Sequence, residues 1–460
     1  MTAPLTVGVE EEFLVVDPVT RVAVTDSQPV FDHLADQDDP RGEDLYDHEL
    51  QQSMVEIHTP ICHSLADVRA ELRQLRANVV RASGDAGRGI VAAGTLPLAD
   101  WRNQRITPTP RYEEMVKAHK QVAREQIVCG CHVHVGISDA EAAVQVLNRA
   151  RLWAPVLLAL SASSPFWMGA DTGYASYRSV LWGRWPTAGT PDAHRSVAEY
   201  HAVVQALIGA GVILDAGQIY WDIRLGHQHD TLEFRIADVC PTIDEAVLQA
   251  GLCRALARTC LDEARSERRL PEARPELLRA ARWRAARSGL DGDLVDVHAA
   301  EPVPAPVLLD RFLTYLRPTL EDTGDWDEVA ALAEQTLRRG NSARRQRQTF
   351  AQSQRLQDVV DLLVAETASA YRAIGPSERT LMGVEERVKQ IIVRQLDPDE
   401  DRITRQARFI EDLNADPQDV IALLSQFERT FEITISGSDP KEIETVGQVI
   451  EYIEAHATSG

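Results

Sequence analysis

Hydrophobic residues in the first half of the chain follow two different periods. Residues 6–16 and 130–137 are rich in apolar and β-branched residues, and a turn signal at Asp17-Pro18 follows the first run, which predicts two strands. Apolar side chains recur every three or four positions across residues 64–83, and residues 142–160 are also helical in pattern. Residues 219–225 and 231–236 predict a hairpin of two strands joined by a short polar turn. We therefore expect strands and helices to alternate in this part of the chain.

The second half is mainly helical and ends in a separate domain. From residue 242 to about residue 371 the apolar pattern is helical, with proline-rich breaks. Residues 374–383 predict a linker between a first domain, residues 1–373, and a small acidic helix bundle, residues 384–460. Residues 163–191 are polar and rich in glycine and aromatic residues, which predicts an active-site loop.

Composition narrows the class of protein. Of the 460 residues, 44% are hydrophobic and 26% are charged, and the net charge is −22, which fits a well-solvated globular protein. The acidic balance argues against general binding to nucleic acid or to an anionic membrane. No apolar run approaches the roughly 18 residues of a membrane span, and the first residues lack the order of a signal peptide, so we expect a cytoplasmic protein. The six cysteines form no CxxC pair, which predicts reduced, mostly buried thiols.

Two glutamates in residues 8–13 are the strongest sign of chemistry. On a strand, Glu10 and Glu12 point to one face and Glu11 points to the other. Carboxylates two residues apart lie about 6–7 Å from one another along the face and repel unless a cation lies between them. Pairing across the sheet with Lys or Arg would satisfy them, and so would a bound metal ion.

A second acidic set falls in residues 48–60. Glu56 and His58 share one strand face with Met54, so a carboxylate stands inside an apolar pattern and needs a partner. We interpret His58 as a neighbouring hydrogen-bonding group rather than a metal ligand.

The strand at residues 130–136 carries two histidines. His132 and His134 share one face, and the cysteines of the segment lie on the opposite face. An HxH pair can bind zinc, but the accompanying glutamates favour a harder cation such as magnesium or manganese.

The predicted hairpin carries a mixture of charges. Glu233 and Arg235 share one face of their strand, and Asp222 and Arg224 share one face of the partner strand. Cross-strand ion pairs would explain all four residues. A surface of carboxylates and guanidiniums also suits a site that holds a metal-bound nucleotide and stabilises a transferring phosphoryl group.

The common phosphate-binding loops are absent from the sequence. No GxxxxGK[ST] or GxGxxG motif occurs in a usable context. Phosphate would therefore have to be held by metal ions and arginines, and Arg344, Arg345 and Arg347 form a local basic cluster that could meet one.

Taken together, the motifs resemble the glutamate-cysteine ligase type 2 family, the carboxylate-amine ligase group of the glutamine-synthetase-like superfamily. The resemblance runs in order through most of residues 1–372 and includes residues 8–13, 49–60, 94–97 (GTLP), 130–136 (GCHVHVG), 221–238, 282–290 and 340–347. It implies an α+β fold in which a glutamine-synthetase-like antiparallel sheet carries helices on one side.

The resemblance also implies a reaction. ATP would bind with two or more Mg²⁺ ions, or Mn²⁺, and phosphorylate the side-chain carboxylate of glutamate, after which an amine attacks and ADP and phosphate are released. The implied metal ligands are Glu10, Glu12, Glu49, Glu56, His132 and Glu233. Glu233 and Arg235 would be catalytic, with Arg235 facing the phosphate. The implied substrate-binding residues are Tyr177, Arg178 and Arg224, and the implied nucleotide-binding residues are Arg344, Arg345 and Arg347.

The last domain resembles a different family, the acyl carrier proteins. Residues 384–389, 409–413 and 446–453 fit the helices of that family. Where carriers have Asp-Ser-Leu, this chain has Asp416-Pro417-Gln418, so the serine that bears phosphopantetheine is missing. The resemblance therefore implies a pseudo-carrier that docks a protein partner or shapes a homo-oligomer.

Three functions remain open on the sequence alone. The chain is a ligase that forms a γ-glutamyl or related amide, a ligase with an amine acceptor other than cysteine, or a degenerate binding module that acts through its tail. The intact acidic motifs argue against the third function, and nothing in the sequence identifies the amine.

Overall fold

A computed structural model of the chain describes residues 4–35, 45–369, 402–413 and 445–456, and single residues or pairs between 388 and 443. The chain divides into two compact units, Met1–Tyr371 and Arg372–Gly460. Each unit has its own hydrophobic core, and each is described separately.

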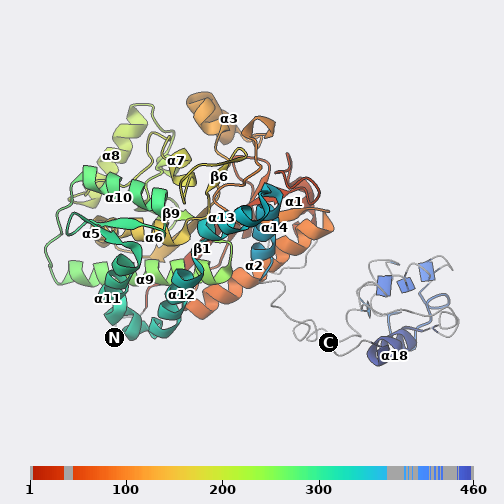
Figure 1. Ribbon diagram of the computed structural model, residues 1–460. Coiled ribbons are helices and arrows are strands. Elements are labelled where there is room, and N and C mark those ends of the chain that lie inside the picture. The colour runs from red at the N-terminus through yellow and green to blue at the C-terminus, as the bar shows by residue number, and fades with distance from the viewer. Residues whose placement is uncertain are drawn as a thin grey trace. The chain divides into compact units, whose positions relative to one another are not determined.

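The first unit is built around an antiparallel sheet of seven strands (Figure 1). Its strands, in spatial order, are β2 (Tyr46–Asp47), β3 (Met54–His58), β1 (Val7–Val16), β5 (Gly130–Gly136), β9 (Thr231–Asp238) and β8 (Ile223–Leu225), with β4 (Gly89–Val91) paired to β1. The predicted strands at residues 6–16 and 130–137 and the predicted hairpin of β8 and β9 are confirmed. Each neighbouring pair is antiparallel, so residues from distant parts of the sequence meet across the sheet.

Helices cover one face of this sheet. Helix α2 (Leu65–Asp85) begins with a capping box in which Ser64 and Asp67 satisfy each other's backbone N–H groups, and its apolar side packs into the core as predicted. Helix α9 (Ile243–Arg265) crosses beside it and contacts β1, β5 and β9. The single helix predicted at residues 142–160 is instead two helices, α5 (Ala140–Ala150) and α6 (Ala154–Ser161). Pro155 lies in the first turn of α6, where its missing N–H needs no partner.

The remaining elements surround this framework. The mainly helical pattern predicted after residue 242 is confirmed by α9, α10 (Pro275–Ser288), α11 (Ala305–Thr323), α12 (Trp326–Arg339), α13 (Ser342–Ser353) and α14 (Leu356–Thr367), interrupted by the hairpin β10 (Asp293–Asp296) and β11 (Glu301–Pro304). The other elements are α1 (Gln28–Ala35), η2 (Trp101–Asn103), α3 (Pro110–His119), α4 (Gln121–Arg124), the hairpin β6 (Phe166–Trp167) and β7 (Ala170–Asp171), α7 (Arg178–Trp182), α8 (Val197–Gly209) and η3 (Ala216–Gln218). The first unit is therefore an α+β fold with an antiparallel sheet, as expected.

Residues 163–191 differ from the expected open loop. They form β6, β7 and α7, and many of their side chains, including Phe166, Leu181 and Trp185, are buried. The polar residues that suggested a loop are buried inside the protein. The hydroxyl groups of Ser164 and Ser176 donate hydrogen bonds to the Asp238 carboxylate, and Ser176 and Ser179 bond to each other.

The alternation on β1 sorts its acidic residues between two faces. Val9, Glu11 and Phe13 are buried on the side of the helices, where Arg76 of α2 pairs with the Glu11 carboxylate. Glu10 and Glu12 therefore point to the face that the helices leave open, as predicted.

The second unit is described only in part. Its buried residues include Phe409, Leu413 and Phe427, and α18 (Val446–His456) contributes Val446, Val449, Ile450 and Ile453 to the same core. Residues 409–413, predicted as part of a helix, form turns instead, although Phe409 and Leu413 are buried as in a core element. Most of the helix predicted at residues 384–389, and the Asp416-Pro417-Gln418 segment, lie outside the described residues. Within the described parts of the chain, no helix is both long and apolar enough to span a membrane.

Candidate active site

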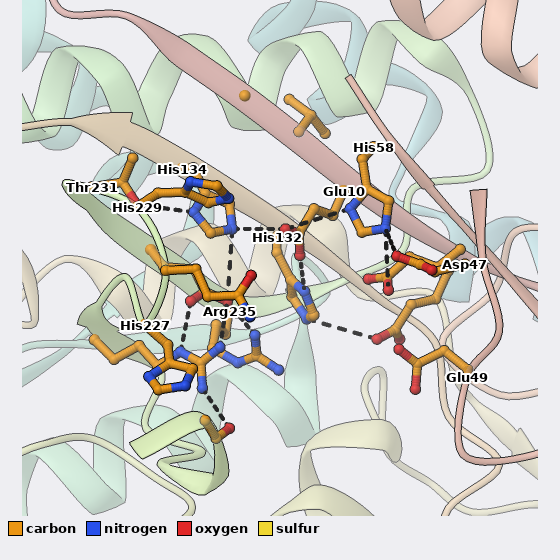
Figure 2. Close-up of a pocket in the computed structure, with 18 of the residues that line it drawn as sticks. Glu10, Asp47, Glu49, His58, His132, His134, His227, His229, Thr231 and Arg235 are labelled. Carbon is orange, nitrogen blue, oxygen red and sulfur yellow. Dashed lines mark hydrogen bonds and ion pairs between the residues drawn. The ribbon is translucent and has the colours of Figure 1, made fainter. Parts of the chain in front are cut away.

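The open face of the sheet forms the floor of a cavity of about 1180 Å³ (Figure 2). Strands β1, β3, β5, β8 and β9 all contribute side chains to it. The acidic, basic and histidine residues that line it are Glu10, Glu12, Asp47, Glu49, Glu56, His58, Arg111, His132, His134, Arg224, His227, His229, Asp230, Glu233 and Arg235. The cavity therefore brings together carboxylates that lie more than 200 residues apart in the sequence.

Glu10 lies at the centre of three histidines. Its Oε2 is 3.1 Å from Nδ1 of His132, and its Oε1 is 3.0 Å from Nε2 of His134 and 3.6 Å from Nδ1 of His58. Burial alone would raise the pKa of Glu10, but the bonds from these histidines hold it well below the usual value. Glu10 is therefore an ionised carboxylate.

Glu12, Glu56 and Glu49 form a buried acidic cluster, and His58 lies at its edge with Nε2 3.6 Å from Oε2 of Glu56. Glu12 faces Glu56 across β1 and β3, and Glu12 also accepts a hydrogen bond from the backbone N–H of Gly130. Burial and the nearby Glu49 raise the pKa of Glu12 to about 8. Burial and the neighbouring carboxylates raise the pKa of Glu56 well above its usual value, and burial raises that of Glu49. These carboxylates need either protons or a cation.

His132 presents a free ring nitrogen to this acidic group. Its Nδ1 faces Glu10, whereas its Nε2 is buried, has no hydrogen-bond partner and lies 3.9 Å from Oε1 of Glu12. Burial and the charge of Arg235 lower the pKa of His132 to about 4, so its imidazole is neutral. A neutral ring with one nitrogen bonded to a carboxylate offers the other nitrogen as a metal ligand.

Three groups of side chains in the described residues have donor atoms close enough to share a metal ion. They are Glu10 with His132 and Glu233, Glu10 with Glu56 and His58, and Glu12 with Glu56 and His132. The cross-strand partners of Glu10 and Glu12 are His58, His132 and Glu56 rather than Lys or Arg. Pairing with Lys or Arg across the sheet, one of the two explanations open for this motif, therefore does not account for it.

The hairpin of β8 and β9 holds a chain of charges beside the carboxylates. Arg224 lies opposite Glu233 and donates from Nε to Oε2 at 2.6 Å, and Arg235 pairs with the other oxygen of Glu233. Although burial opposes it, the charges of Arg235 and Arg224 lower the pKa of Glu233. Asp222 is not part of these ion pairs, because it pairs with Arg282 of α10.

The other residues expected at the site lie in different places. Arg178 is buried next to the floor, where its charge is the strongest influence that lowers the pKa of Glu12. Tyr177 does not line the cavity and packs near Tyr174 and Trp167. Glu49 lines the cavity but belongs to none of the three candidate metal groups found among the described residues.

The three arginines of α13 lie away from the cavity. Arg344 pairs with Asp291, Arg345 pairs with Glu245 and Glu366, and Arg347 pairs with Asp171. None of them is among the residues that line the cavity. Their charges are balanced by these carboxylates, which a basic run in the sequence does not reveal.

The sequence predicted the wall that faces the sheet only in part, because Trp182 and Trp185 fall within the active-site loop expected at residues 163–191 and the other residues of the wall do not. Tyr112 and Met115 of α3, Trp182 of α7, Trp185 and Tyr220 line the cavity, and most of them belong to a small separate hydrophobic cluster. The one available signal was the density of aromatic residues near residues 182–185 and 220–221.

Comparisons with known proteins agree with this geometry. The chain matches the model of glutamate-cysteine ligase family 2 over residues 6–362 and that of the phosphopantetheine attachment site over residues 386–453. Over 374 residues it is 46% identical to the "Putative glutamate--cysteine ligase 2-2" of Frankia alni, covering 79% of this chain and 97% of that relative. A protein of the same name from Frankia casuarinae is also 46% identical over 374 residues, covering 80% of this chain. The chain spans only 43% of the length of that second relative.

Solved structures define the fold. The glutamate–cysteine ligase of Francisella tularensis, crystallised with AMP, has a TM-score of 0.62 at 13% identity, covering 81% of this chain and 90% of that one. The bifunctional glutathione synthetase of Pasteurella multocida has a TM-score of 0.59 at 18% identity, covering 80% of this chain and 52% of that one. By its fold, the first unit belongs to the class that includes glutamate–cysteine ligases. By its sequence, the chain belongs to glutamate-cysteine ligase family 2.

Proposed function

We propose that the protein is an ATP-dependent carboxylate-amine ligase that phosphorylates the side-chain carboxylate of glutamate and joins it to an amine, releasing ADP and phosphate. The observation that carries the proposal is the convergence of Glu10, Glu12, Glu56, His132 and Glu233 on one open face of the sheet. Family membership supports the same reaction class.

The donor set fits divalent metal ions. The four carboxylates supply the oxygen ligands that Mg²⁺ and Mn²⁺ prefer, and the neutral imidazole adds one nitrogen. Nε2 of His132 is buried without a hydrogen-bond partner, and a bound metal ion would satisfy it. Glu10, Glu12, Glu56, His132 and Glu233 would hold the metal ions. When bound, the ions would offset the negative charge of the ATP phosphates.

Arg235 would stabilise the transferring phosphoryl group. Its guanidinium is buried, is held by Glu233, and lies over the Trp182 ring with Cζ 5.8 Å from the ring centroid. A cation fixed in this way is already oriented when charge develops on the phosphoryl oxygens. The glutamate carboxylate would attack the γ-phosphate to give an acyl phosphate, and the amine would then displace phosphate to form the amide.

The cavity also leaves the choice of amine open. Its volume of about 1180 Å³ exceeds the roughly 300–1,000 Å³ of most small-molecule sites, so an acceptor other than cysteine could fit beside ATP and glutamate. We extend the proposal to a cytoplasmic enzyme whose carrier-like unit docks a protein partner or joins copies of the chain.

A panel of amines tests the proposal. Purified protein is incubated with Mg²⁺, ATP and glutamate, ADP release is followed, and the product is identified by mass spectrometry. We expect ADP release that depends on glutamate and on at least one amine, and that Glu12→Gln and Glu233→Gln abolish. Glu321→Gln, on the exposed side of α11, is the matched control and should leave the rate unchanged. An absence of ADP release with every amine would contradict the ligase function and favour a binding module.

A further inference from the structure

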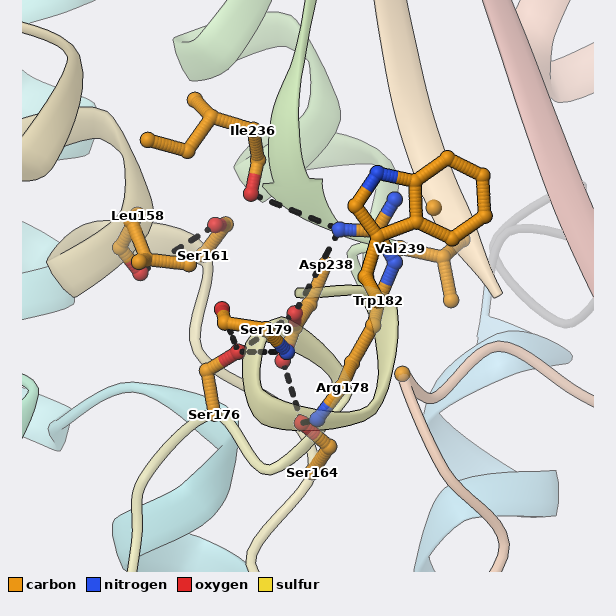
Figure 3. A network of polar contacts seen from close by, with 12 residues as sticks. Leu158, Ser161, Ser164, Ser176, Arg178, Ser179, Trp182, Ile236, Asp238 and Val239 are labelled. Atoms are coloured by element: carbon orange, nitrogen blue, oxygen red, sulfur yellow. Dashed lines mark hydrogen bonds and ion pairs between the residues drawn. The ribbon is translucent and has the colours of Figure 1, made fainter. Parts of the chain in front are cut away.

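A buried polar network lies behind the cavity floor and is centred on Asp238 at the end of β9 (Figure 3). Its side chain is completely buried. Oδ2 accepts hydrogen bonds from the backbone N–H of Ser163 at 2.9 Å and from Oγ of Ser164 at 2.7 Å, and Oδ1 accepts one from Oγ of Ser176 at 2.8 Å. The Asp238 carboxylate thus connects the end of β9 to both ends of the segment 163–176, which precedes α7.

The network continues directly into α7. Oγ of Ser176 lies 2.6 Å from Oγ of Ser179, and Oγ of Ser164 accepts a hydrogen bond at 3.0 Å from the backbone N–H of Arg178. The Arg178 guanidinium then turns back toward Asp238, with Nη1 3.9 Å from Oδ1. The position of this short helix is therefore set by Asp238 and the serines around it.

Two glycines make room for these side chains. A Cβ atom at Gly94 would lie 2.7 Å from Cγ of Asp238, and one at Gly130 would lie 2.3 Å from Nη2 of Arg178. A side chain at Gly94 would displace the Asp238 carboxylate, which is short and bonded on both oxygens, and one at Gly130 would displace the end of the Arg178 side chain from its present position. The glycines Gly94 of the GTLP motif and Gly130 of the GCHVHVG motif thus allow Asp238 and Arg178 to pack directly against the backbone.

The network ends at Arg178 and Trp182, which lie next to residues that line the cavity. Arg178 lies beside Glu12, whose pKa its charge lowers, and the Cβ position at Gly130 that would meet Arg178 would also lie 3.0 Å from Nε2 of His132. The Trp182 ring has Cζ of Arg178 5.5 Å from its centroid and Cζ of Arg235 5.8 Å from it. Trp182 is fixed in turn by a hydrogen bond from Nε1 to the carbonyl of Tyr220 at 3.2 Å. Trp182 of α7 therefore contacts Arg235, the cation that would meet the phosphates, through its ring.

We propose that Asp238 and Trp182 are positioning residues for phosphoryl transfer: Asp238 anchors α7, and Trp182 on that helix holds the Arg235 and Arg178 guanidiniums beside the metal-ligand group. This inference rests on the proposed function. Arg178 also donates to the carbonyls of Ile236 and Arg235, and Arg235 pairs with Glu233, but the buried Nε atom of each guanidinium has no hydrogen-bond partner, so the indole adds a contact that these bonds do not supply.

The test uses substitutions that remove the Trp182 ring or the Asp238 charge, together with a measurement of stability. The full-length protein carries Trp182→Leu, Trp182→Phe or Asp238→Asn, with Trp283→Leu on exposed α10 and Asp296→Asn in the Arg311 pair as matched controls. Binding of Mg·ADP is measured by calorimetry, KM for ATP and for glutamate by ADP release, and Tm by calorimetric scanning. We expect Trp182→Leu and Asp238→Asn to weaken Mg·ADP binding and raise KM for ATP about tenfold, with KM for glutamate unchanged. Trp182→Phe, which keeps an aromatic face, should stay within about threefold of wild type.

The outcomes distinguish positioning from stability. If Trp182→Leu binds Mg·ADP as tightly as wild type, or if Trp182→Phe is as impaired as Trp182→Leu, the positioning role is overturned, whatever the change in Tm. A wild-type protein that binds Mg·ADP but releases ADP with no amine would contradict the proposed function, while the binding data would still decide the positioning role. A wild-type protein that does not bind Mg·ADP would overturn both.

Discussion

Glu12 is a buried carboxylate whose charge depends on what else is bound. Burial and Glu49 raise the pKa of Glu12 to about 8, although the charges of Arg178 and Arg235 oppose the rise. Hydrogen bonds to Asp47 and Glu10 raise the pKa of His58 to about 9 despite burial. Both groups hold their protons more tightly in the folded protein than in the unfolded chain. Their contributions to stability are therefore present at low pH and are lost as pH rises through about 8 and 9.

The first prediction concerns this coupling of protons and metal. We expect the metal-free protein to lose thermal stability between pH 7 and pH 9, because Glu12 and His58 lose their protons in that window. Mg²⁺ should then raise Tm more at pH 9 than at pH 7, because a deprotonated Glu12 binds the ion without first releasing a proton. Thermal unfolding at both pH values, with and without Mg²⁺, measures this difference. In Glu12→Gln the increment from Mg²⁺ should be small at both values, and equal increments in the wild type would contradict the assignment.

Strand β1 directs Glu10 and Glu12 to the cavity and Glu11, between them, to the buried face that packs against the helices. Period-two alternation is a local property, so the sequence alone could place Glu10 and Glu12 on one side and Glu11 on the other. Strand order is not local, and which strands meet β1 depends on packing across more than 200 residues. The resemblance to a family implied an antiparallel sheet but no strand order, so the order and the partners of Glu12 came only from the structure.

The second prediction tests the buried face of β1. Glu11 and Arg76 form a two-point ion pair that is almost fully buried, and Arg76 also donates to the carbonyls of Cys240 and Pro241. Removing one charge should leave the other unpaired, so Glu11→Gln should lower the free energy of unfolding by roughly 3–5 kcal/mol. Urea titration measures the loss. Glu10→Gln, one residue away but facing the cavity, should cost far less stability while abolishing ADP release, and equal losses for the two variants would contradict the division of faces.

Helix α13 shows where element-scale reasoning from sequence fails. Its run of arginines is typical of a phosphate site, but each arginine meets a carboxylate from another element: Asp291, Glu245, Glu366 and Asp171. A sequence gives the charge of a side chain but not the long-range partner that neutralises it. Residues 163–191 failed as a loop prediction for a related reason, because their serines are satisfied by one buried carboxylate, Asp238.

The whole molecule joins a ligase-family unit to a unit that matches a phosphopantetheine attachment site. The second unit has its own buried core, so its family match reflects a folded module rather than a stray motif. The resemblance to carriers places Pro417, which has no hydroxyl group to be modified, where those proteins have the attachment serine. We therefore expect the carrier-like unit to resemble carriers in pattern but to lack the nucleophile of their chemistry.

The third prediction follows from that difference. Treatment of the intact chain with coenzyme A and a phosphopantetheinyl transferase should leave its mass unchanged. Pro417→Ser, which restores an Asp-Ser pair, is the matched variant and should gain one phosphopantetheine group. Intact-protein mass spectrometry reads both results, and a mass increase in the wild type would show that another residue carries the group.

The central claim is that the cavity activates the side-chain carboxylate of glutamate by transferring the γ-phosphoryl group of ATP to it. The most direct test uses glutamate labelled with ¹⁸O in its side-chain carboxylate, together with Mg·ATP and an accepted amine. If an acyl phosphate forms and the amine displaces it, one labelled oxygen must appear in each phosphate released, and mass spectrometry of the phosphate counts it. Phosphate that carries no label from the carboxylate would contradict the claim.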